Sequence, residues 1–413
     1  MSGLSCTKGW CSLSVNQTAR DQALELFREE GFTVTVKGDF MLVHDVPYLT
    51  AGPTLRRGTL IAKFIAVGDH LQPPENHQVW FQGEFPHCAN GQQFTAIGMP
   101  NPVGEIGQGV IANFHFSCRP DPYIPYTRHI DLISHYEKLL THQALALDRT
   151  VTARTRRGIH MEKVPTPFRY PDAASIRGDY LSTSERLKLN RVAIIGLGGT
   201  GSYVLDQVAK TPVREIHLFD SDTFEVHNAF RAPGAASLED LEKQLAKVDY
   251  WAREYGRMHL GVVPHRTHVA EHNLQELLGF DFVFLTIDNG PARKVISTYL
   301  RQNNVPFVDC GMDLKLDREN TQAIYGQCRI TLSTPKQHDH FDSYAPFMPE
   351  GGDGLYESNI QTADMNAINA MLAVIRWKQY FGFYADQQHP HQQVYTPSLH
   401  SLTRSVSNPE SKA

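Results

Sequence analysis

The chain has 413 residues, with 39 basic and 44 acidic side chains and a formal net charge of −5. At roughly 150 residues per domain, this length predicts two to three domains. Its 41% of hydrophobic residues excludes global disorder. The slightly acidic balance excludes a strongly basic nucleic-acid-binding domain, so no nucleic-acid partner is expected. The N-terminus shows no signal-peptide pattern and no apolar run is long enough to span a membrane, so we expect a soluble, cytoplasmic protein without a membrane partner.

The six cysteines contain no C-x-x-C pair. This spacing supports neither a disulfide framework nor a structural zinc site, and no structural zinc is expected.

Residues 1–155 are expected to form an α+β domain with an antiparallel meander flanked by helices. Helical composition or periodicity marks residues 21–30 and 130–147, and strand-like runs mark residues 33–46, 59–67, 77–85 and 109–118. The stretch 149–163, rich in Arg and Thr, is interpreted as a linker.

Residues 156–386 alternate between strand-like and helical segments. We expect strands at 192–195, 216–219, 262–269, 282–287 and 307–308, and helices at 200–210, 238–255, 291–303 and 359–381. This alternation predicts an α/β domain with a Rossmann-like, doubly wound, mostly parallel sheet. Residues 387–413 are expected to be a loosely packed tail.

A glycine loop follows the first of these strands, with Gly196, Gly198, Gly199 and Gly201 between strand and helix. Such glycines let the backbone approach a phosphate, and the helix N-terminus offers free N–H donors. Alone, the pattern also suits a dehydrogenase, in which an acidic residue such as Asp220 would hold a ribose hydroxyl.

The loop after Asp220 favours a nucleotidyl transferase instead, because a second carboxylate, Asp222, and an arginine, Arg231, follow closely. With Lys247, Arg231 would neutralise a triphosphate, and Asp288 at the end of a later strand would hold Mg²⁺. We interpret the adjacent pair Arg293-Lys294 as surface charge on a helix.

These motifs resemble those of the ThiF/MoeB family, which includes the adenylation domains of ubiquitin-activating enzymes. The family's motifs match, in order, the glycine loop, the D-x-D-x5-N-x2-R signature, a helix lysine and the magnesium aspartate, at Gly196, Gly198, Gly199, Gly201, Asp220, Asp222, Asn228, Arg231, Lys247 (with Lys243 as a competitor) and Asp288. The resemblance covers residues 165–385. It implies adenylation of the C-terminal carboxylate of a ubiquitin-like protein with ATP and Mg²⁺, in a homodimer.

Family members often borrow an arginine from the dimer partner. Arg177 lies in the corresponding region, with Arg169 and Arg186 as rivals.

The N-terminal half resembles, more loosely, the ubiquitin-conjugating-enzyme fold. Residues 77–87 are similar to its third strand and turn, and Pro100-Asn101 is similar to its His-Pro-Asn motif without the His. The next cysteine, Cys118, is seventeen positions beyond Asn101 and lies in a strand-like run. We therefore expect a non-catalytic domain that binds a partner, with a separate conjugating-enzyme-like protein acting downstream. The fusion of both halves resembles proteins of bacterial ubiquitin-like modification operons.

The covalent acceptor, if one exists, stays open. Direct transfer to another protein ranks first. A hydroxyl such as Ser343 in the expected crossover loop, 333–358, ranks second, and Cys310 or Cys328, expected to be buried, ranks third.

Three alternatives to the activation of a ubiquitin-like protein remain at this point: adenylation of a sulfur-carrier protein or an RNA-linked carboxylate, a nucleotide-stabilised binding scaffold, and a nicotinamide dehydrogenase.

Overall fold

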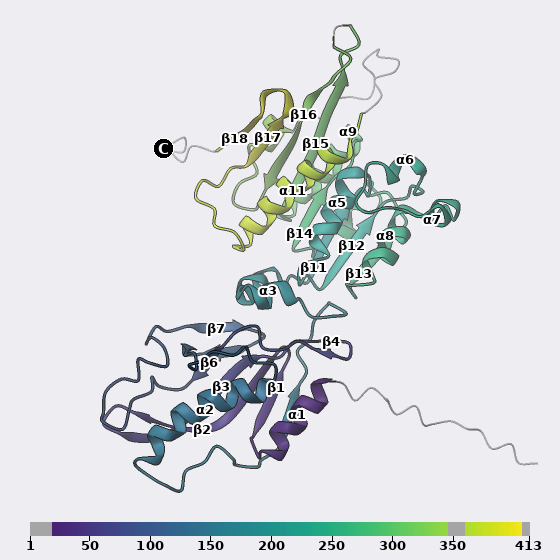
Figure 1. The fold of residues 1–413 in the computed structure, drawn as a ribbon. Coiled ribbons are helices and arrows are strands. Elements are labelled where there is room, and N and C mark those ends of the chain that lie inside the picture. Colours follow the sequence, from purple (N-terminus) through teal and green to yellow (C-terminus); the bar gives the residue numbers. More distant parts are fainter. Residues whose placement is uncertain (1–18, 320, 346–359, 407–413) are drawn as a thin grey trace, which may run out of the picture. The chain divides into compact units, whose positions relative to one another are not determined.

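The computed structural model describes residues 19–319, 321–345 and 360–406 (Figure 1). The chain divides into two compact units, one made of Met1–Pro165 with Tyr170–Ser182 and the other of Thr166–Arg169 with Thr183–Ala413. The chain therefore enters the second unit briefly at residues 166–169 before it returns to the first. Residues 166–169 pair with the rest of the second unit through a bridge between Phe168 and His259 and a 2.7 Å hydrogen bond from the Leu260 N–H to the Pro167 carbonyl.

The first unit is an α+β fold. Its helices and strands are α1 (Ala19–Glu29), β1 (Val34–Lys37), β2 (Phe40–Thr50), β3 (Thr54–Lys63), β4 (Ala66–Val67), β5 (His70–Leu71), β6 (Gln78–Gln82), β7 (Gly104–Gly107), β8 (Val110–Ala112), β9 (Phe114–Ser117), α2 (His129–Leu145), β10 (Ile159–Glu162) and α3 (Ala173–Arg177), and α4 (Leu181–Ser184) begins at its end.

Six strands form its main sheet in the order β10-β1-β2-β3-β6-β9, and the meander β1-β2-β3-β6-β9 is antiparallel. Helix α2 crosses one face of this sheet, over β2 and β3 (Figure 1). Alternate strand residues such as Val43, Leu60 and Phe116 are fully buried in the core that also contains Ile133 and Tyr136 of α2. The period-2 pattern of the sequence therefore corresponds to one buried sheet face.

The stretch 149–163, which we expected to be a linker, contains a strand. Ile159–Glu162 forms β10, which pairs in parallel with β1 from Val34↔Ile159 to Lys37↔Glu162. Four residues with weak alternation carry little sequence signal. The backbone groups on the open edge of β1 provide the pairing partner.

The second unit is an α/β fold. Its elements are η1 (Glu185–Leu187), β11 (Arg191–Ile195), α5 (Gly199–Val208), β12 (Glu215–Phe219), α6 (Val226–Ala229), α7 (Leu238–Glu242), α8 (Lys247–Tyr255), β13 (Val262–His265), η2 (Leu274–Leu277), β14 (Phe282–Leu285), α9 (Gly290–Gln302), β15 (Phe307–Leu316), β16 (Ile324–Ser333), α10 (Phe341–Tyr344), α11 (Ala363–Tyr380), β17 (Gln392–Thr396), η3 (Pro397–Leu399) and β18 (Ser401–Ser405).

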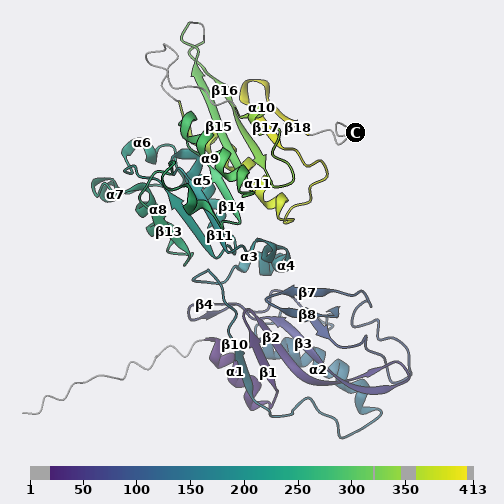
Figure 2. The ribbon, with the colours of Figure 1, turned by 180° about the vertical axis from the view of Figure 1, so that it is seen from behind.

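The eight strands follow the order β13-β12-β11-β14-β15-β16-β17-β18. The first five are parallel to their neighbours, and β16, β17 and β18 continue the sheet antiparallel. Helices α5 and α11 cover one face (Figure 1), and α9 and α10 cover the other (Figure 2). The sequence-based expectation of a doubly wound α/β sheet is confirmed. Strand order reverses between β11 and β14, which is where such sheets bind ligands.

Two expectations for this unit were wrong in detail. The single helix expected over 238–255 is two helices, because Ala246 forms a bridge with Thr223 and the Lys247 N–H donates to the Asp222 carbonyl at 2.8 Å. The expected loose tail from residue 387 instead contributes β17 and β18. These strands satisfy the backbone groups at the open edge of β16.

Candidate nucleotide-binding site

The glycine loop lies where β11 ends and α5 begins. Gly196 has φ +92°, a left-handed conformation that favours glycine. A Cβ on Gly201 would lie 1.9 Å from the carbonyl oxygen of Gly196, so the first turn of α5 packs directly on the loop. Thr286, just after β14, holds the loop from the other side, since its hydroxyl donates to the carbonyls of Ile195 and Gly196 at 2.9 and 2.7 Å.

Gly198 differs from its neighbours in having open space around it. A Cβ at this position would meet no atom within 4 Å. Gly198 is the N-cap of α5, and among the described residues no side-chain hydrogen bond caps this helix end. The first N–H groups of α5 are therefore available to an anion at the crevice between β11 and β14.

Asp220, just after β12, connects the loop to the next segment. One carboxylate oxygen accepts from the N–H of Leu197 in the glycine loop at 2.7 Å, and the other accepts from the Asp222 N–H at 2.8 Å. Asp220 is only 6% exposed, so both bonds are shielded from water. Each oxygen keeps a second lone pair that a ribose hydroxyl could use.

Lys247 meets this pair of carboxylates. It is the first residue of α8, and its Nζ lies 2.6 Å from Asp222 Oδ2 and 3.9 Å from Asp220 Oδ1. The hydrogen bond from Lys247 lowers the pKa of the Asp222 carboxyl below its ordinary value. The break between α7 and α8 places Lys247 here. Lys243, its competitor in the sequence, is more exposed and pairs with Glu239 on its own helix at 2.7 Å.

Asn228 and Arg231 follow in the α6 segment. The Asn228 side chain is 3% exposed and accepts from the Glu225 N–H at 2.9 Å, so its amide oxygen shapes the turn itself. The Arg231 N–H donates to the Asn228 carbonyl at 3.1 Å. Within the described residues, the Nε of Arg231 is buried without a hydrogen-bond partner. Such an orphaned cationic donor fits a site for an anionic ligand.

Asp288 lies after β14 and is exposed. It follows the strand next to β11, so it stands at the same sheet edge as the glycine loop. The next residue, Asn289, caps α9 by accepting from the Ala292 N–H at 2.8 Å. This cap fixes the turn that carries Asp288.

The comparison of the sequence with family models assigns both halves. Residues 22–173 match the domain of unknown function DUF6791, and residues 176–377 match the ThiF family.

Residues 176–377 are a ThiF family domain.

Curated relatives match part of the chain. The chain is similar to ubiquitin-like modifier-activating enzyme 5 of Drosophila mojavensis, at 27% identity over 139 residues, covering 31% of this chain and 35% of that protein. It is also similar to the SUMO-activating enzyme subunit uba-2 of Caenorhabditis elegans, at 23% identity over 188 residues, covering 39% of this chain and 31% of that protein. The chain thus spans about a third of the length of these relatives.

Among solved structures, the chain is similar to a crystal structure of E. coli MccB with ATP, at 16% identity and a TM-score of 0.45 over 56% of this chain and 71% of that one. It is similar to a crystal structure of PaaA at 18% identity and a TM-score of 0.45, over 67% and 85% of the two chains. No helix among the described residues is long and apolar enough to cross a membrane.

The candidate nucleophiles of the ThiF domain differ in accessibility. Burial raises the pKa of the Cys328 thiol to about 12 and raises that of Cys310 as well. Both cysteines lie in the core, so neither is a thiolate near neutral pH. Ser343 is exposed in α10. Residues 346–358 of the expected crossover loop lie outside the described residues.

The expected helix-surface charge at Arg293 is wrong, because its side chain is only 10% exposed. Its guanidinium makes two hydrogen bonds to the fully buried Asp309, at 2.9 and 2.5 Å, and Arg329 adds a third at 2.9 Å. Burial acts to raise the pKa of the Asp309 carboxyl, but the two guanidinium groups lower it below its ordinary value. No local pattern in the sequence reveals this pairing, since the three residues lie on three different elements.

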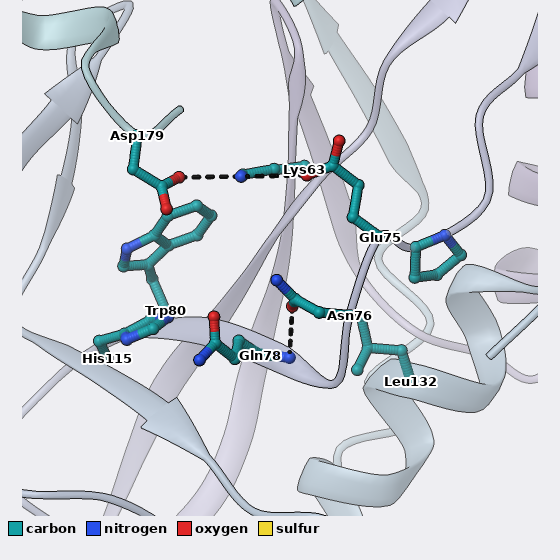
Figure 3. A pocket seen from close by; sticks show the side chains of 9 residues that line it. Lys63, Glu75, Asn76, Gln78, Trp80, His115, Leu132 and Asp179 are labelled. Carbon is teal, nitrogen blue, oxygen red and sulfur yellow. Dashed lines mark hydrogen bonds and ion pairs between the residues drawn. The ribbon is translucent and has the colours of Figure 1, made fainter. Parts of the chain in front are cut away.

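A small pocket lies in the first unit, and Figure 3 shows its lining. The Nζ of Lys63 is 2.8 Å from Asp179 Oδ1 and 3.4 Å from Glu75 Oε2, beside the ring of Trp80 (Figure 3). The Nε of Arg177 lies 2.6 Å from Glu75 Oε1. Arg177 is therefore part of an ion-pair network that ties α3 to the sheet of its own unit.

The rivals of Arg177 also have partners. The guanidinium groups of Arg169 and Arg186 donate to the carbonyls of Gly256 and Gly382.

Sequence reasoning did not find Asn366, on α11. This side chain is fully buried, accepts from the Thr200 hydroxyl at 2.9 Å and packs on Gly199. An asparagine among the apolar core positions of a helix, beside Met365 and Ala370, is a signal that could have marked it.

Proposed function

We propose that the ThiF domain adenylates the C-terminal carboxylate of a ubiquitin-like protein, with ATP and Mg²⁺. The observation that carries this proposal is the buried Lys247, held by Asp222 and Asp220 beside the uncapped N-terminus of α5. A nicotinamide site needs a carboxylate for the ribose but has no use for a buried lysine, nor for a nearby arginine whose buried Nε has no partner among the described residues. A triphosphate matches this charge set better.

In the proposed reaction, an oxygen of the client carboxylate attacks the α-phosphorus of ATP. A new P–O bond forms, the bond from the α-phosphorus to its bridging oxygen breaks, and pyrophosphate leaves. Lys247 and Arg231 would offset the charge on the phosphate oxygens, and the N–H groups of α5 would orient them. Asp288 would hold Mg²⁺, which in such sites takes one or two carboxylates together with phosphate oxygens and water.

The client class is supported by the similarity of the chain to ubiquitin-like modifier-activating enzyme 5 and to the SUMO-activating enzyme subunit uba-2. We extend this to a bacterial ubiquitin-like conjugation pathway, in which the enzyme acts in the cytoplasm as a homodimer and passes its client to a separate conjugating-enzyme-like protein. The site residues proposed are Gly196, Gly198, Gly199, Gly201, Asp220, Asp222, Asn228, Arg231, Lys247 and Asp288, with Arg177 as the arginine that acts across the dimer.

For the first unit we propose a non-catalytic relative of the ubiquitin-conjugating enzymes that positions a partner. The order of a helix, an antiparallel meander and a second helix supports this proposal. So does Cys118, which packs with Phe114 against the core that contains Phe116 and whose pKa is raised by burial.

Client-dependent ATP–pyrophosphate exchange tests the function. Lys247→Ala and Asp288→Ala are expected to reduce exchange at least 100-fold. The matched control is Lys243→Ala, which removes the same functional group from an exposed position on the preceding helix and should leave exchange near the wild-type rate.

Undiminished exchange in Asp288→Ala, or equal losses in Lys243→Ala and Lys247→Ala, would contradict the assignment. Tight ATP binding without exchange, with ubiquitin-like and sulfur-carrier clients supplied in turn, would identify a scaffold instead. Exchange with a sulfur carrier alone would keep the reaction and change the client.

A further inference from the structure

Asn366 is an unusual residue for its place in the fold. It lies in the first turn of α11 and has no exposed surface, beside the buried Met365. Asparagine is rarely buried completely, and a buried amide without partners is costly. The contacts of this amide therefore indicate its function.

The amide of Asn366 joins two segments of the nucleotide site. Its Oδ1 accepts from the Thr200 hydroxyl at 2.9 Å, in the first turn of α5. Its Nδ2 donates to the backbone carbonyl of Arg231 at 3.4 Å. It also packs so closely on Gly199 that a Cβ there would lie 2.1 Å from Nδ2.

We propose that Asn366 is a positioning residue for ATP: its amide sets the spacing between the helix N-terminus that meets the phosphates and the backbone that carries Arg231. The inference rests on the proposed function insofar as the ligand of that site is ATP. Asn366 itself need not contact the nucleotide.

The chemistry of an amide fits this role. The two partners, a hydroxyl donor and a carbonyl acceptor, require one acceptor and one donor on the same short side chain, and asparagine supplies both. An aspartate of the same shape could accept from Thr200 but could not donate to Arg231.

The side chain of Arg231 agrees with this arrangement. Its backbone is held on both sides, by the Asn366 amide at the carbonyl and by Asn228 at the N–H, while its Nε has no partner among the described residues. The protein thus fixes the backbone of Arg231 and leaves the Nε of its guanidinium available to a ligand. Preorganisation of this kind lowers the entropy lost on binding.

Asn369 provides a matched control. It lies one turn further along α11, is 1% exposed and donates to the carbonyl of Gly311 at 3.2 Å, on β15. Asn369→Ala therefore removes a buried amide of the same helix whose hydrogen bond goes to β15 and not to the glycine loop or Arg231. A general loss of helix packing would affect both variants alike.

The experiment measures the dissociation constant for ATP by calorimetry on the full chain without client, together with thermal unfolding. Both Asn366→Ala and Asn369→Ala should lower the melting temperature. Only Asn366→Ala should weaken ATP binding, by at least 10-fold, and raise the KM for ATP in exchange more than it lowers kcat.

Thr200→Val keeps the test decisive if Asn366→Ala fails to fold, because it removes the same hydrogen bond from the other side with little change in shape. Thr200→Val alone should therefore also weaken ATP binding. Where Asn366→Ala folds, the two changes should be strongly non-additive in a double-mutant cycle for ATP affinity. Equal ATP affinity in Asn366→Ala and wild type, or equal losses in the Asn366 and Asn369 variants, would overturn the inference.

The two proposals fail in different ways. A wild-type chain that binds ATP but shows no client-dependent exchange refutes the proposed function and leaves the Asn366 test valid. A wild-type chain that does not bind ATP refutes both.

Discussion

Gly198 gives the sharpest test of where the phosphates bind. Gly196 and Gly201 are explained by contacts and conformation within the protein. Gly198 is not, since a Cβ there would meet no atom within 4 Å. We infer that the missing side chain at Gly198 serves the ligand. Gly198→Ala should therefore fold normally and bind ATP poorly.

The expected magnitudes follow from the position of Gly198 as the N-cap of α5, with φ −69°. Replacing glycine by alanine stiffens the unfolded chain and stabilises the fold by about 0.4–1 kcal/mol. Alanine is a poorer N-cap than glycine by about the same amount. The two effects nearly cancel, so the free energy of unfolding should change by less than about 1 kcal/mol. Losing one charge-assisted bond from an N–H of α5 to a phosphate should cost about 1.5–3 kcal/mol, which is about a 10- to 150-fold weaker Kd.

Calorimetric titration with ATP and thermal unfolding of the same samples measure both quantities. Gly201→Ala is the contrasting variant, because its Cβ would lie 1.9 Å from the Gly196 carbonyl oxygen and the backbone would have to move. It should lose stability, by about 1–3 kcal/mol or more. Wild-type ATP affinity in Gly198→Ala would show that the phosphates do not approach this loop.

Three further predictions concern stability. Asp309→Asn should lower the free energy of unfolding by about 3–5 kcal/mol in a urea titration, because it leaves Arg293 and Arg329 buried without their counter-charge. Since the pKa of Asp309 is lowered in the folded state, its stabilisation should be present above about pH 4 and lost at lower pH; a wild-type stability that does not fall there would contradict this. Burial lowers the pKa of His129 to about 4, below its ordinary value near 6.5. Between about pH 6.5 and 4 the unfolded chain therefore binds a proton that the folded chain does not. As the pH falls through this range, the free energy of unfolding should decrease by up to about 3 kcal/mol, and His129→Gln should make this decrease smaller. Cys118→Ala should cost about 1 kcal/mol of stability and leave adenylation and onward transfer intact, whereas a client thioester that forms on the wild type and is lost in this variant would show an active conjugating enzyme.

The parts of the structure that could be predicted from the sequence are those encoded locally. The glycine loop, Asp220 and Asp222 lie within one strand–helix–strand unit, so their spacing and their strand ends sufficed to place them near one another. The assignment of Lys247 depended on the length of a loop. In the structure, the pairing of residues 245–247 with the segment after β12 breaks the helix and places Lys247 beside Asp222.

The parts that could not be predicted depend on partners distant in sequence. Asn366 contacts Thr200, 166 positions earlier, and Arg293 is paired with residues on two strands. Each of these polar residues also occurs on helix surfaces, and only the packing decides that it is buried. The strands β10 and β17 gave weak alternation, since open neighbouring edges rather than a strong pattern of their own recruit them.

The short excursion of residues 166–169 has a practical consequence for dividing the protein. The backbone passes from one unit to the other after residues 165, 169 and 182, so the two units are interleaved in sequence. A fragment that begins at residue 183 lacks the Phe168–His259 bridge, and one that begins at residue 166 carries residues 170–182 away from the unit they belong to. A chimera that exchanges one unit for that of a homologue therefore needs three junctions. The segment 166–169 has to travel with the ThiF domain, and α3 with the first unit.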